Sequence, residues 1–270
     1  MDPALDLTAT VIVGGTIAAL LMGLSKTGLP PLGAFGAAVI ASVLPPVQAA
    51  GVALPLLIVG DLVAVSAYGR DVRWRILRGL LPSVTLGLIV GFAALRWASP
   101  EVSARIVGAL LLLAGLGDLV RQLAARRARR RPPAPASTPV PDGDAAPTRP
   151  RLGERVIRAA LGATAGVSTM IANAGGPPMS LYLLRAGISR AGLLGTVALF
   201  FLTVNVAKLP FSAGLGLVSP ASLHVSLVLL PGLVAGLVLG KLVAHRISGP
   251  VFSTVVLIAT SVAGARLLLA

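Results

Sequence analysis

Residues 23–33 of the chain are GLSKTGLPPLG, and residues 171–180 are IANAGGPPMS. Each stretch places glycine and a double proline inside otherwise apolar sequence, and the second proline pair follows the first after 147 residues. Proline lacks a backbone donor and glycine permits unusual dihedral angles, so both stretches should interrupt a helix. The recurrence of one break in both halves predicts a duplicated chain. The prolines at the two predicted breaks are Pro30, Pro31, Pro177 and Pro178.

The composition around these stretches is typical of a membrane protein. Of the 270 residues, 56% are hydrophobic and 12% are charged, and the mean hydropathy is +0.92. A soluble domain carries roughly 25% charged residues. Apolar runs of about twenty residues, the length that spans about 30 Å of hydrocarbon, recur from end to end. These features exclude an ordinary soluble enzyme and predict a polytopic membrane protein. Cysteine is absent, which excludes disulfides and thiolate metal sites.

A second pair of matching stretches supports the duplication. PSVTLGLIVG at 82–91 and PGLVAGLVLG at 231–240 lie 149 residues apart, and each carries a GxxxG pattern that lets helices pack closely. Two predicted segments, 31–44 and 178–186, would reach only about 21 Å and about 14 Å, too short to cross the bilayer. We therefore predict an all-α fold with eight to ten transmembrane segments in two repeats with broken helices. The predicted segments are 8–24, 31–44, 47–67, 78–96, 101–121, 156–172, 178–186, 191–213, 222–243 and 250–269.

The basic residues of the short loops predict how the repeats are oriented. The loop at 69–79 carries four arginines and should be cytoplasmic, whereas its counterpart at 212–224 has no Lys or Arg and should be outside. The next pair reverses this bias, because Arg96 is balanced by Glu101 in the first half while the loop at 241–249 carries a lysine and an arginine. Equivalent loops on opposite sides indicate inverted-topology repeats, with both termini outside.

A basic stretch at 122–154 separates the first repeat, 1–121, from the second, 155–270. Ten of the 23 basic residues lie between Arg121 and Arg158. The stretch is rich in proline and alanine and lacks aromatic residues, so it cannot bury enough apolar area to fold. We interpret it as a flexible cytoplasmic linker that contacts anionic lipids. The alternative is a docking tail for anionic lipid or RNA; we expect no nucleic-acid partner.

The two breaks supply groups that suit an anion. Hydroxyl and amide side chains there can donate hydrogen bonds, Lys26 adds positive charge, and the helix start after each proline pair has a dipole that favours anions. Interrupted helices near the midplane are a common binding-site design in transporters. The alternative is a plain polar loop in which Lys26 extends to the membrane interface. The polar and glycine residues at the breaks are Ser25, Lys26, Thr27, Gly28, Ser168, Thr169, Asn173, Gly175 and Gly176.

Two ionisable residues lie within predicted spans, where an unpaired charge costs roughly 2.5 to 3.5 kcal/mol or more. Asp61 and Lys208 are 147 residues apart, like the proline pairs, so the repeat symmetry could bring them towards one another. Asn205 lies one turn before Lys208 and could face the same cavity. In a transporter, Lys208 would bind or gate the anion and Asp61 could carry a proton. The alternative is a structural role, either at a helix end or in a stabilising pair.

The motifs around these residues resemble those of a known family. GLSKTGLPPLG at 23–33 and the stretch from TMIANAGGPPMSLYLL to NVAKLPF at 169–211 are similar to the two repeat motifs of the sulfite exporter TauE/SafE family, in its SKTG-containing branch. The resemblance covers nearly the whole chain except the linker. This chain departs from the family pattern in GLPPLG, where GLPGLG is expected, and in AGGPP, where AAGP is more usual.

The resemblance implies export or exchange of small anions, often sulfur-containing, such as sulfite or an organosulfonate, across a bacterial inner (plasma) membrane. The resemblance implies that the positions most important for this activity are Ser25 to Gly28, Asn173 to Pro178, Asn205 and Lys208. With no nucleotide-binding, catalytic or metal motif, we expect a secondary transporter with no cofactor and no enzymatic activity, driven by a gradient of protons or of the substrate. The alternative is a membrane scaffold or assembly subunit that transports nothing. A homo-oligomer fits either alternative.

Overall fold

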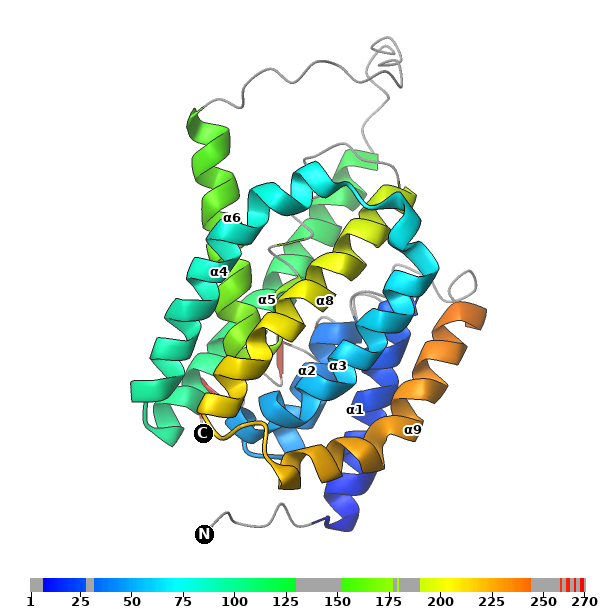
Figure 1. Cartoon of the computed structure of the whole chain (residues 1–270), viewed down its shortest axis with the longest axis vertical. Helices are drawn as coiled ribbons and strands as arrows, with labels where there is room; N and C mark the ends of the chain where they lie inside the picture. Colours follow the sequence, from blue (N-terminus) through cyan, green and yellow to red (C-terminus); the bar gives the residue numbers. More distant parts are fainter. Residues whose placement is uncertain are drawn as a thin grey trace.

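The computed structural model describes residues 7–27, 32–129, 152–176, 179, 190–243, 258, 261, 262, 265, 268 and 269. Within these residues the fold is helical and contains no strand, as predicted (Figure 1). Most of the predicted segments 178–186 and 250–269, and residues 130–151 of the predicted linker, lie outside the described residues. The described helices are α1 Ala9–Thr27, α2 Leu32–Val43, α3 Pro46–Tyr68, the short 3₁₀ helix η1 Gly69–Asp71, α4 Trp74–Trp97, α5 Pro100–Arg129, α6 Leu152–Ala172, α8 Arg190–Gly214 and α9 Pro220–Val243.

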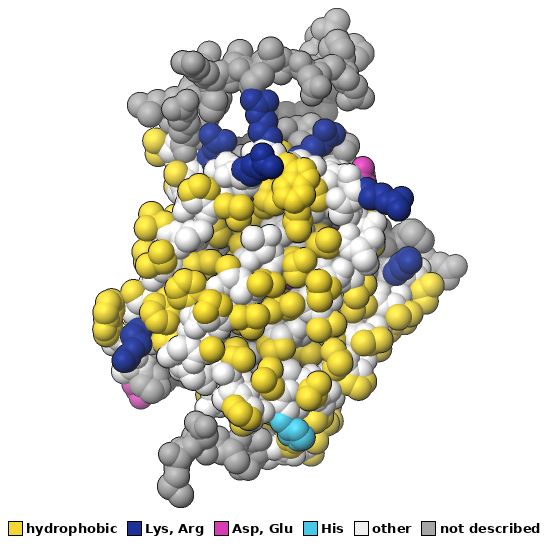
Figure 2. All heavy atoms as spheres, viewed as in Figure 1, with side chains coloured by type: hydrophobic (Ala, Val, Ile, Leu, Met, Phe, Trp, Pro, Cys, Tyr) yellow, Lys and Arg dark blue, Asp and Glu magenta, His cyan; other side chains and the backbone are white. Residues whose placement is uncertain are grey.

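The surface and the helix lengths confirm a polytopic membrane protein. Hydrophobic side chains cover the middle of the face shown in Figure 2, and several Lys and Arg side chains gather at its upper end. Trp74 and Trp97 are exposed at opposite ends of α4, about 35 Å apart, which is where aromatic residues mark the two membrane interfaces. In the described part of the chain, five helices are long and apolar enough to cross a membrane: Ala9–Thr27, Val47–Asp71, Trp74–Trp97, Gly195–Gly214 and Pro220–Leu242.

Helix ends agree with some predicted boundaries and differ from others. The 12 residues of α2 extend about 18 Å, too short to span the bilayer, as expected for the segment predicted at 31–44. The fifth helix, α5, continues to Arg129, so the first eight residues of the stretch predicted as a linker are helical. Its alanines and arginines are good helix formers, and they extend the helix beyond its apolar part.

The same close helix contact between the two halves occurs twice. A Cβ atom on Gly23 of α1 would lie 2.3 Å from the carbonyl oxygen of Leu233 in α9, and one on Gly166 of α6 would lie 2.2 Å from that of Val84 in α4. The two glycines are 143 residues apart and their two partners are 149 residues apart. Only glycine fits where two helix backbones touch in this way. The α1–α9 and α6–α4 pairs are therefore equivalent parts of a duplicated fold.

The GxxxG glycines lie in these same contacts. A Cβ on Gly87 would lie 2.1 Å from the carbonyl oxygen of Ala163, and one on Gly236 would lie 2.1 Å from that of Leu20. Gly87 and Gly236 are 149 residues apart, and the residues that they meet, Leu20 and Ala163, are 143 residues apart. The predicted packing function of both GxxxG patterns is confirmed.

The repeats run in opposite directions. In Figure 1, α3 and α4 join at the upper end of the molecule, whereas the equivalent α8 and α9 join at the lower end, where α1 begins. The upper connection carries the arginine-rich loop and the lower connection, residues 215–219, carries no Lys or Arg. This is the inverted arrangement that the loop charges predict.

A seam between two hydrophobic clusters positions the site. One cluster is built mainly by α4, α6 and α8, and the other by α1, α2, α3 and α9. Helices α3 and α8 pack against each other between the two clusters. Polar side chains on α3 and α8 at this seam are therefore surrounded by protein instead of lipid.

Candidate functional site

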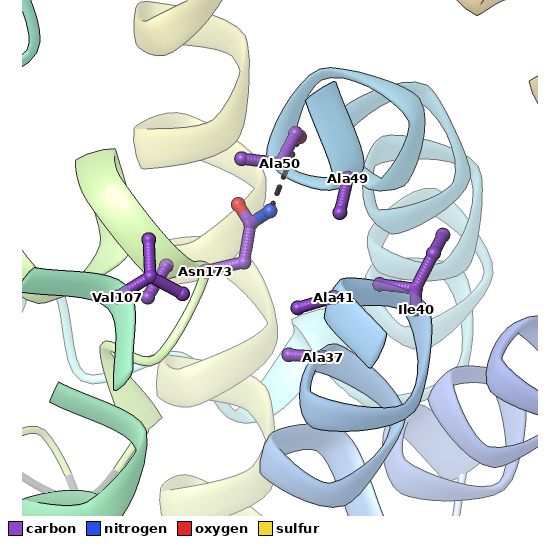
Figure 3. Close-up of a pocket in the computed structure, with 8 residues that line it drawn as sticks. Ala37, Ile40, Ala41, Ala49, Ala50, Val107 and Asn173 are labelled. Atoms are coloured by element: carbon purple, nitrogen blue, oxygen red, sulfur yellow. Dashed lines mark hydrogen bonds between the residues drawn. The ribbon is translucent and has the colours of Figure 1, made fainter. Parts of the chain in front are cut away.

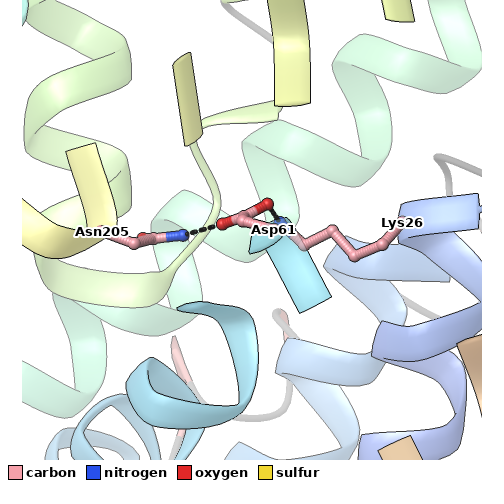
Figure 4. A network of polar contacts seen from close by, with 3 residues as sticks. All are labelled: Lys26, Asp61 and Asn205. Carbon is pink, nitrogen blue, oxygen red and sulfur yellow. Dashed lines mark hydrogen bonds and ion pairs between the residues drawn. The ribbon is translucent and has the colours of Figure 1, made fainter. Parts of the chain in front are cut away.

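A buried carboxylate lies at the centre of the seam. Asp61, on α3, is 0% exposed. Lys26, in the last turn of α1, donates to Asp61 Oδ1, and Asn205 Nδ2, on α8, donates to Asp61 Oδ2 over 2.7 Å (Figure 4). Both carboxylate oxygens therefore accept a hydrogen bond, which is the condition under which a charge is tolerated in an apolar interior.

Small and aromatic neighbours direct the Lys26 side chain inward. A Cβ atom on Gly60 would lie 3.1 Å from Lys26 Cγ, so the stem of the lysine passes closely over the glycine. The Lys26 ammonium lies 4.9 Å from the centroid of the Phe201 ring, which is a cation–π distance. The ammonium thus faces Asp61 and Phe201 within the protein.

Lys208 forms the second half of the site. It lies three residues after Asn205 on the same face of α8 and is 2% exposed. Its ammonium donates to the carbonyl oxygen of Thr169 over 2.6 Å and to Asn173 Oδ1. Both acceptors belong to the end of α6, and Lys208 contacts no carboxylate directly in the described part of the chain.

Asn173 adopts a left-handed backbone conformation just after α6. Its φ of 52° is one that asparagine tolerates better than most residues, and its N–H donates to the carbonyl oxygen of Thr169 over 3.2 Å. This turn places Asn173 Oδ1 on Lys208, while Asn173 Nδ2 donates to the carbonyl oxygen of Ala50 on α3 over 3.2 Å. The second break therefore joins α6, α8 and α3 through one side chain.

A small pocket opens beside Asn173 (Figure 3). Helices α2, α3, α5 and α6 line it, mostly with alanine, and Asn173 is the polar side chain among the described lining residues. The Asn173 amide thus connects the Lys208 contact to this pocket. The lining residues are Ala37, Ile40, Ala41, Ala49, Ala50, Val107, Ala172 and Asn173.

The duplicated fold relates the two lysines indirectly. Lys26 and Thr169 are 143 residues apart, like the packed glycines of α1 and α6, and Asp61 and Lys208 are 147 residues apart. In the first half a cation on α1 contacts an anion on α3, whereas in the second half a carbonyl on α6 contacts a cation on α8. The positive group therefore lies on the first helix of this contact in one half (α1) and on the second helix in the other half (α8).

Other predicted residues lie away from this cluster or outside the described part of the chain. Thr27 is buried and donates to the carbonyl oxygen of Leu237 over 2.9 Å, so it attaches the end of α1 to α9. Ser25 Oγ lies 2.7 Å from the position of a Cβ on Gly33, so Ser25 packs against α2. A Cβ on Gly175 would meet Thr169, at 2.9 Å, and Phe201. Gly176 has open space around it. The positions Gly28, Pro30, Pro31, Pro177 and Pro178 lie outside the described residues.

Phe201 is a site residue that the sequence interpretation missed. It lies four residues before Asn205 and seven before Lys208, so the three share one face of α8. That spacing was available in the sequence. An aromatic residue at helical spacing is so common in apolar segments, however, that only its contact with Lys26 distinguishes it.

The fold and the site define an integral membrane protein in which two inverted helical repeats meet at a largely buried cluster of two lysines, one aspartate and one asparagine. The chain belongs to the sulfite exporter TauE/SafE family, whose model matches residues 7–267. No curated protein and no solved structure matches the chain. The family agrees with the resemblance carried by the two break motifs, and it is a family of membrane transporters.

Proposed function

We propose that the protein is a secondary transporter, an exporter or exchanger, of a small sulfur-containing anion such as sulfite or an organosulfonate. The observation that carries this proposal is the charge of the seam cluster. It contains the buried ammonium group of Lys208, the ammonium group of Lys26, whose side chain is 13% exposed, and the buried carboxylate of Asp61, so its formal charge is +1. Family membership supports the sulfur-containing class.

An excess positive charge inside a membrane is costly unless an anion accompanies it. A lysine at the centre of a span costs roughly 2.5 to 3.5 kcal/mol on insertion scales. Asp61 offsets Lys26, whereas the acceptors that Lys208 contacts among the described residues are the neutral oxygens of Thr169 and Asn173. A bound monovalent anion would neutralise the formal charge of the cluster. The site is therefore suited to binding an anion, in addition to holding the helices together.

Asp61 gives the same site a means of coupling to protons. Protonation of Asp61 would remove the carboxylate charge next to Lys26 and raise the formal charge of the cluster from +1 to +2. Anion binding and proton uptake would then favour each other by charge balance. We therefore propose Asp61 as the proton-coupling residue of a transporter in the bacterial inner membrane.

Uptake of radiolabelled sulfite into proteoliposomes tests the proposal. We expect Lys26→Met and Lys208→Met each to abolish uptake. Lys241→Met, at an exposed position at the end of α9, should retain it and serves as the matched control. Thermal unfolding of each variant checks that it is folded, and a rise in the melting temperature of the unmodified protein with sulfite reports binding independently. Uptake at the unmodified rate in both buried-lysine variants would refute the proposal.

A further inference from the structure

One buried polar atom of the cluster has no hydrogen-bond partner. Asn205 is 1% exposed, and its Oδ1 is the buried side-chain atom without a partner within the described part of the chain. A buried acceptor left unpaired is destabilising, because it has lost its hydrogen bonds to water and gained none in the protein. Such atoms are uncommon in native proteins and require an explanation.

The chemistry of Asp61 fixes which atom is unpaired. While Asp61 is ionised it only accepts hydrogen bonds, so the edge of the Asn205 amide that faces it is then the NH₂ group. The carbonyl oxygen of Asn205 therefore points away from Asp61. Exchanging the two ends of the amide would place two acceptors against each other and would not supply a partner.

The residue that carries the unpaired oxygen lies on the face of α8 to which the proposed function assigns the anion. Phe201, Asn205 and Lys208 share one face of α8; Phe201 contacts the Lys26 ammonium and Lys208 carries the second ammonium. An anion held by these ammonium groups would therefore lie beside an acceptor that neither lysine contacts in the described structure. A donor on the anion itself would satisfy this atom.

We propose that the transported anion carries a hydrogen-bond donor in addition to its negative charge, and that Asn205 Oδ1 selects for that donor. This inference rests on the proposed function and narrows its substrate class. Two kinds of compound share the chemistry: an oxyanion that retains a proton, and an organosulfonate with a hydroxyl or ammonium group. Sulfonates without a donor would leave Asn205 unpaired in the complex, and the site would bind them more weakly.

A matched pair of sulfonates tests the selection directly. Isethionate (2-hydroxyethanesulfonate) and 1-propanesulfonate have the same charge and similar size, but only the first has a donor. Binding to the purified protein, measured by calorimetry, should favour isethionate by about fivefold or more, the ratio expected for one buried hydrogen bond. Sulfite, measured at pH values on both sides of its second ionisation, tests the protonated oxyanion in the same way.

Substitution of Asn205 identifies the residue responsible. In Asn205→Leu the ratio between the two sulfonates should fall to about one, because the acceptor that favours isethionate is gone, whereas loss of the bond to Asp61 affects both ligands alike. A purely structural function of Asn205 would instead weaken both ligands equally. The ratio in the unmodified protein tests the donor requirement even if Asn205→Leu fails to fold.

The outcomes separate this inference from the function on which it rests. Equal binding of both sulfonates by the unmodified protein, or an unchanged preference in folded Asn205→Leu, overturns the inference and leaves anion transport standing. If neither sulfonate nor sulfite binds or is transported, the proposed function fails, and the inference fails with it.

Discussion

Replacement of Asp61 by asparagine should strongly destabilise the protein by leaving the half-buried Lys26 and the buried Lys208 without a carboxylate. Asparagine is nearly isosteric with aspartate, so the packing of α3 against α8 is kept while the charge of the cluster rises from +1 to +2. Lys26 loses its ion pair, and neither Phe201 nor Asn205 can supply a negative charge. The perturbation is therefore electrostatic and not steric.

The size of the effect follows from the burial of the pair. Breaking a buried ion pair by removing one partner costs about 3 to 5 kcal/mol, because the other charge remains buried and uncompensated. Removing both partners with side chains of similar volume is often close to neutral. Asp61→Asn should lower the free energy of unfolding by about 3 kcal/mol or more, and the double variant Asp61→Asn/Lys26→Met should recover at least about 2 kcal/mol of that loss.

Unfolding of the purified protein in detergent micelles, with all variants under the same conditions, measures these differences. Asp71→Asn, which neutralises an exposed acid on η1, is the control and should change stability by less than about 0.5 kcal/mol. Lys26→Met should rescue Asp61→Asn better than Lys208→Met does, because Lys26 is the one of these two lysines that contacts Asp61 directly. The reasoning is refuted if Asp61→Asn is as stable as the unmodified protein, or if the double variant loses the sum of the two single losses.

Two further predictions concern the duplicated architecture. Gly87→Ala and Gly236→Ala should each destabilise the protein by about 1 to 3 kcal/mol in the same unfolding assay, because the added Cβ would meet a carbonyl oxygen at 2.1 Å in both cases. Gly117→Ala has no atom within 4 Å and should be tolerated, so an equal loss at all three positions would contradict the packing argument. Because the chain lacks cysteine, Arg75→Cys and Ala213→Cys can be labelled individually. An impermeant maleimide should reach position 213 in intact cells but position 75 only after permeabilisation, and labelling of both from one side would exclude inverted repeats.

The sequence predicted the large-scale arrangement because a few residue types determine it. Proline pairs and apolar lengths indicated short segments, and the predicted one at 31–44 agrees with α2. The arginines of 69–79 and their absence from 212–224 indicated opposite orientations, which the described helices adopt. Lysine and arginine side chains act on topology through their number and position alone, so no knowledge of packing is required.

The alignment of the repeats was harder to predict in detail. Aligning the halves on their proline pairs, 147 residues apart, places Lys26 opposite Asn173. The glycine contacts of α1 and α6 have a spacing of 143, which places Lys26 opposite Thr169, about one helical turn earlier. The second half therefore contains four more residues between its packed face and its prolines. Apolar sequence tolerates such a shift without any visible change in pattern.

The partners of each charged side chain were also beyond sequence reasoning. The spacing of 147 residues suggested that Asp61 and Lys208 approach each other. In the structure the two are close enough to interact electrostatically, but they do not pair. Asp61 bonds Lys26 and Asn205, and Lys208 bonds the end of α6. Helical periodicity indicates which residues share a face of one helix. Which residues meet across two helices depends also on how each helix is rotated about its axis, on where the helices cross and on how far a long side chain reaches.

The cluster lies where two tightly packed helix pairs meet, and each pair joins a helix of one repeat to a helix of the other. Gly23 and Gly166 hold α1 on α9 and α6 on α4 through backbone contact, so each pair should move as a unit. Lys26 belongs to the first pair, whereas the partners of Lys208 belong to the second. A displacement of one pair relative to the other must therefore change the lysine contacts at the α3–α8 seam. An anion held between the two ammonium groups would stabilise the arrangement in which both can reach it, and this differential stabilisation is what a gradient-driven transporter requires.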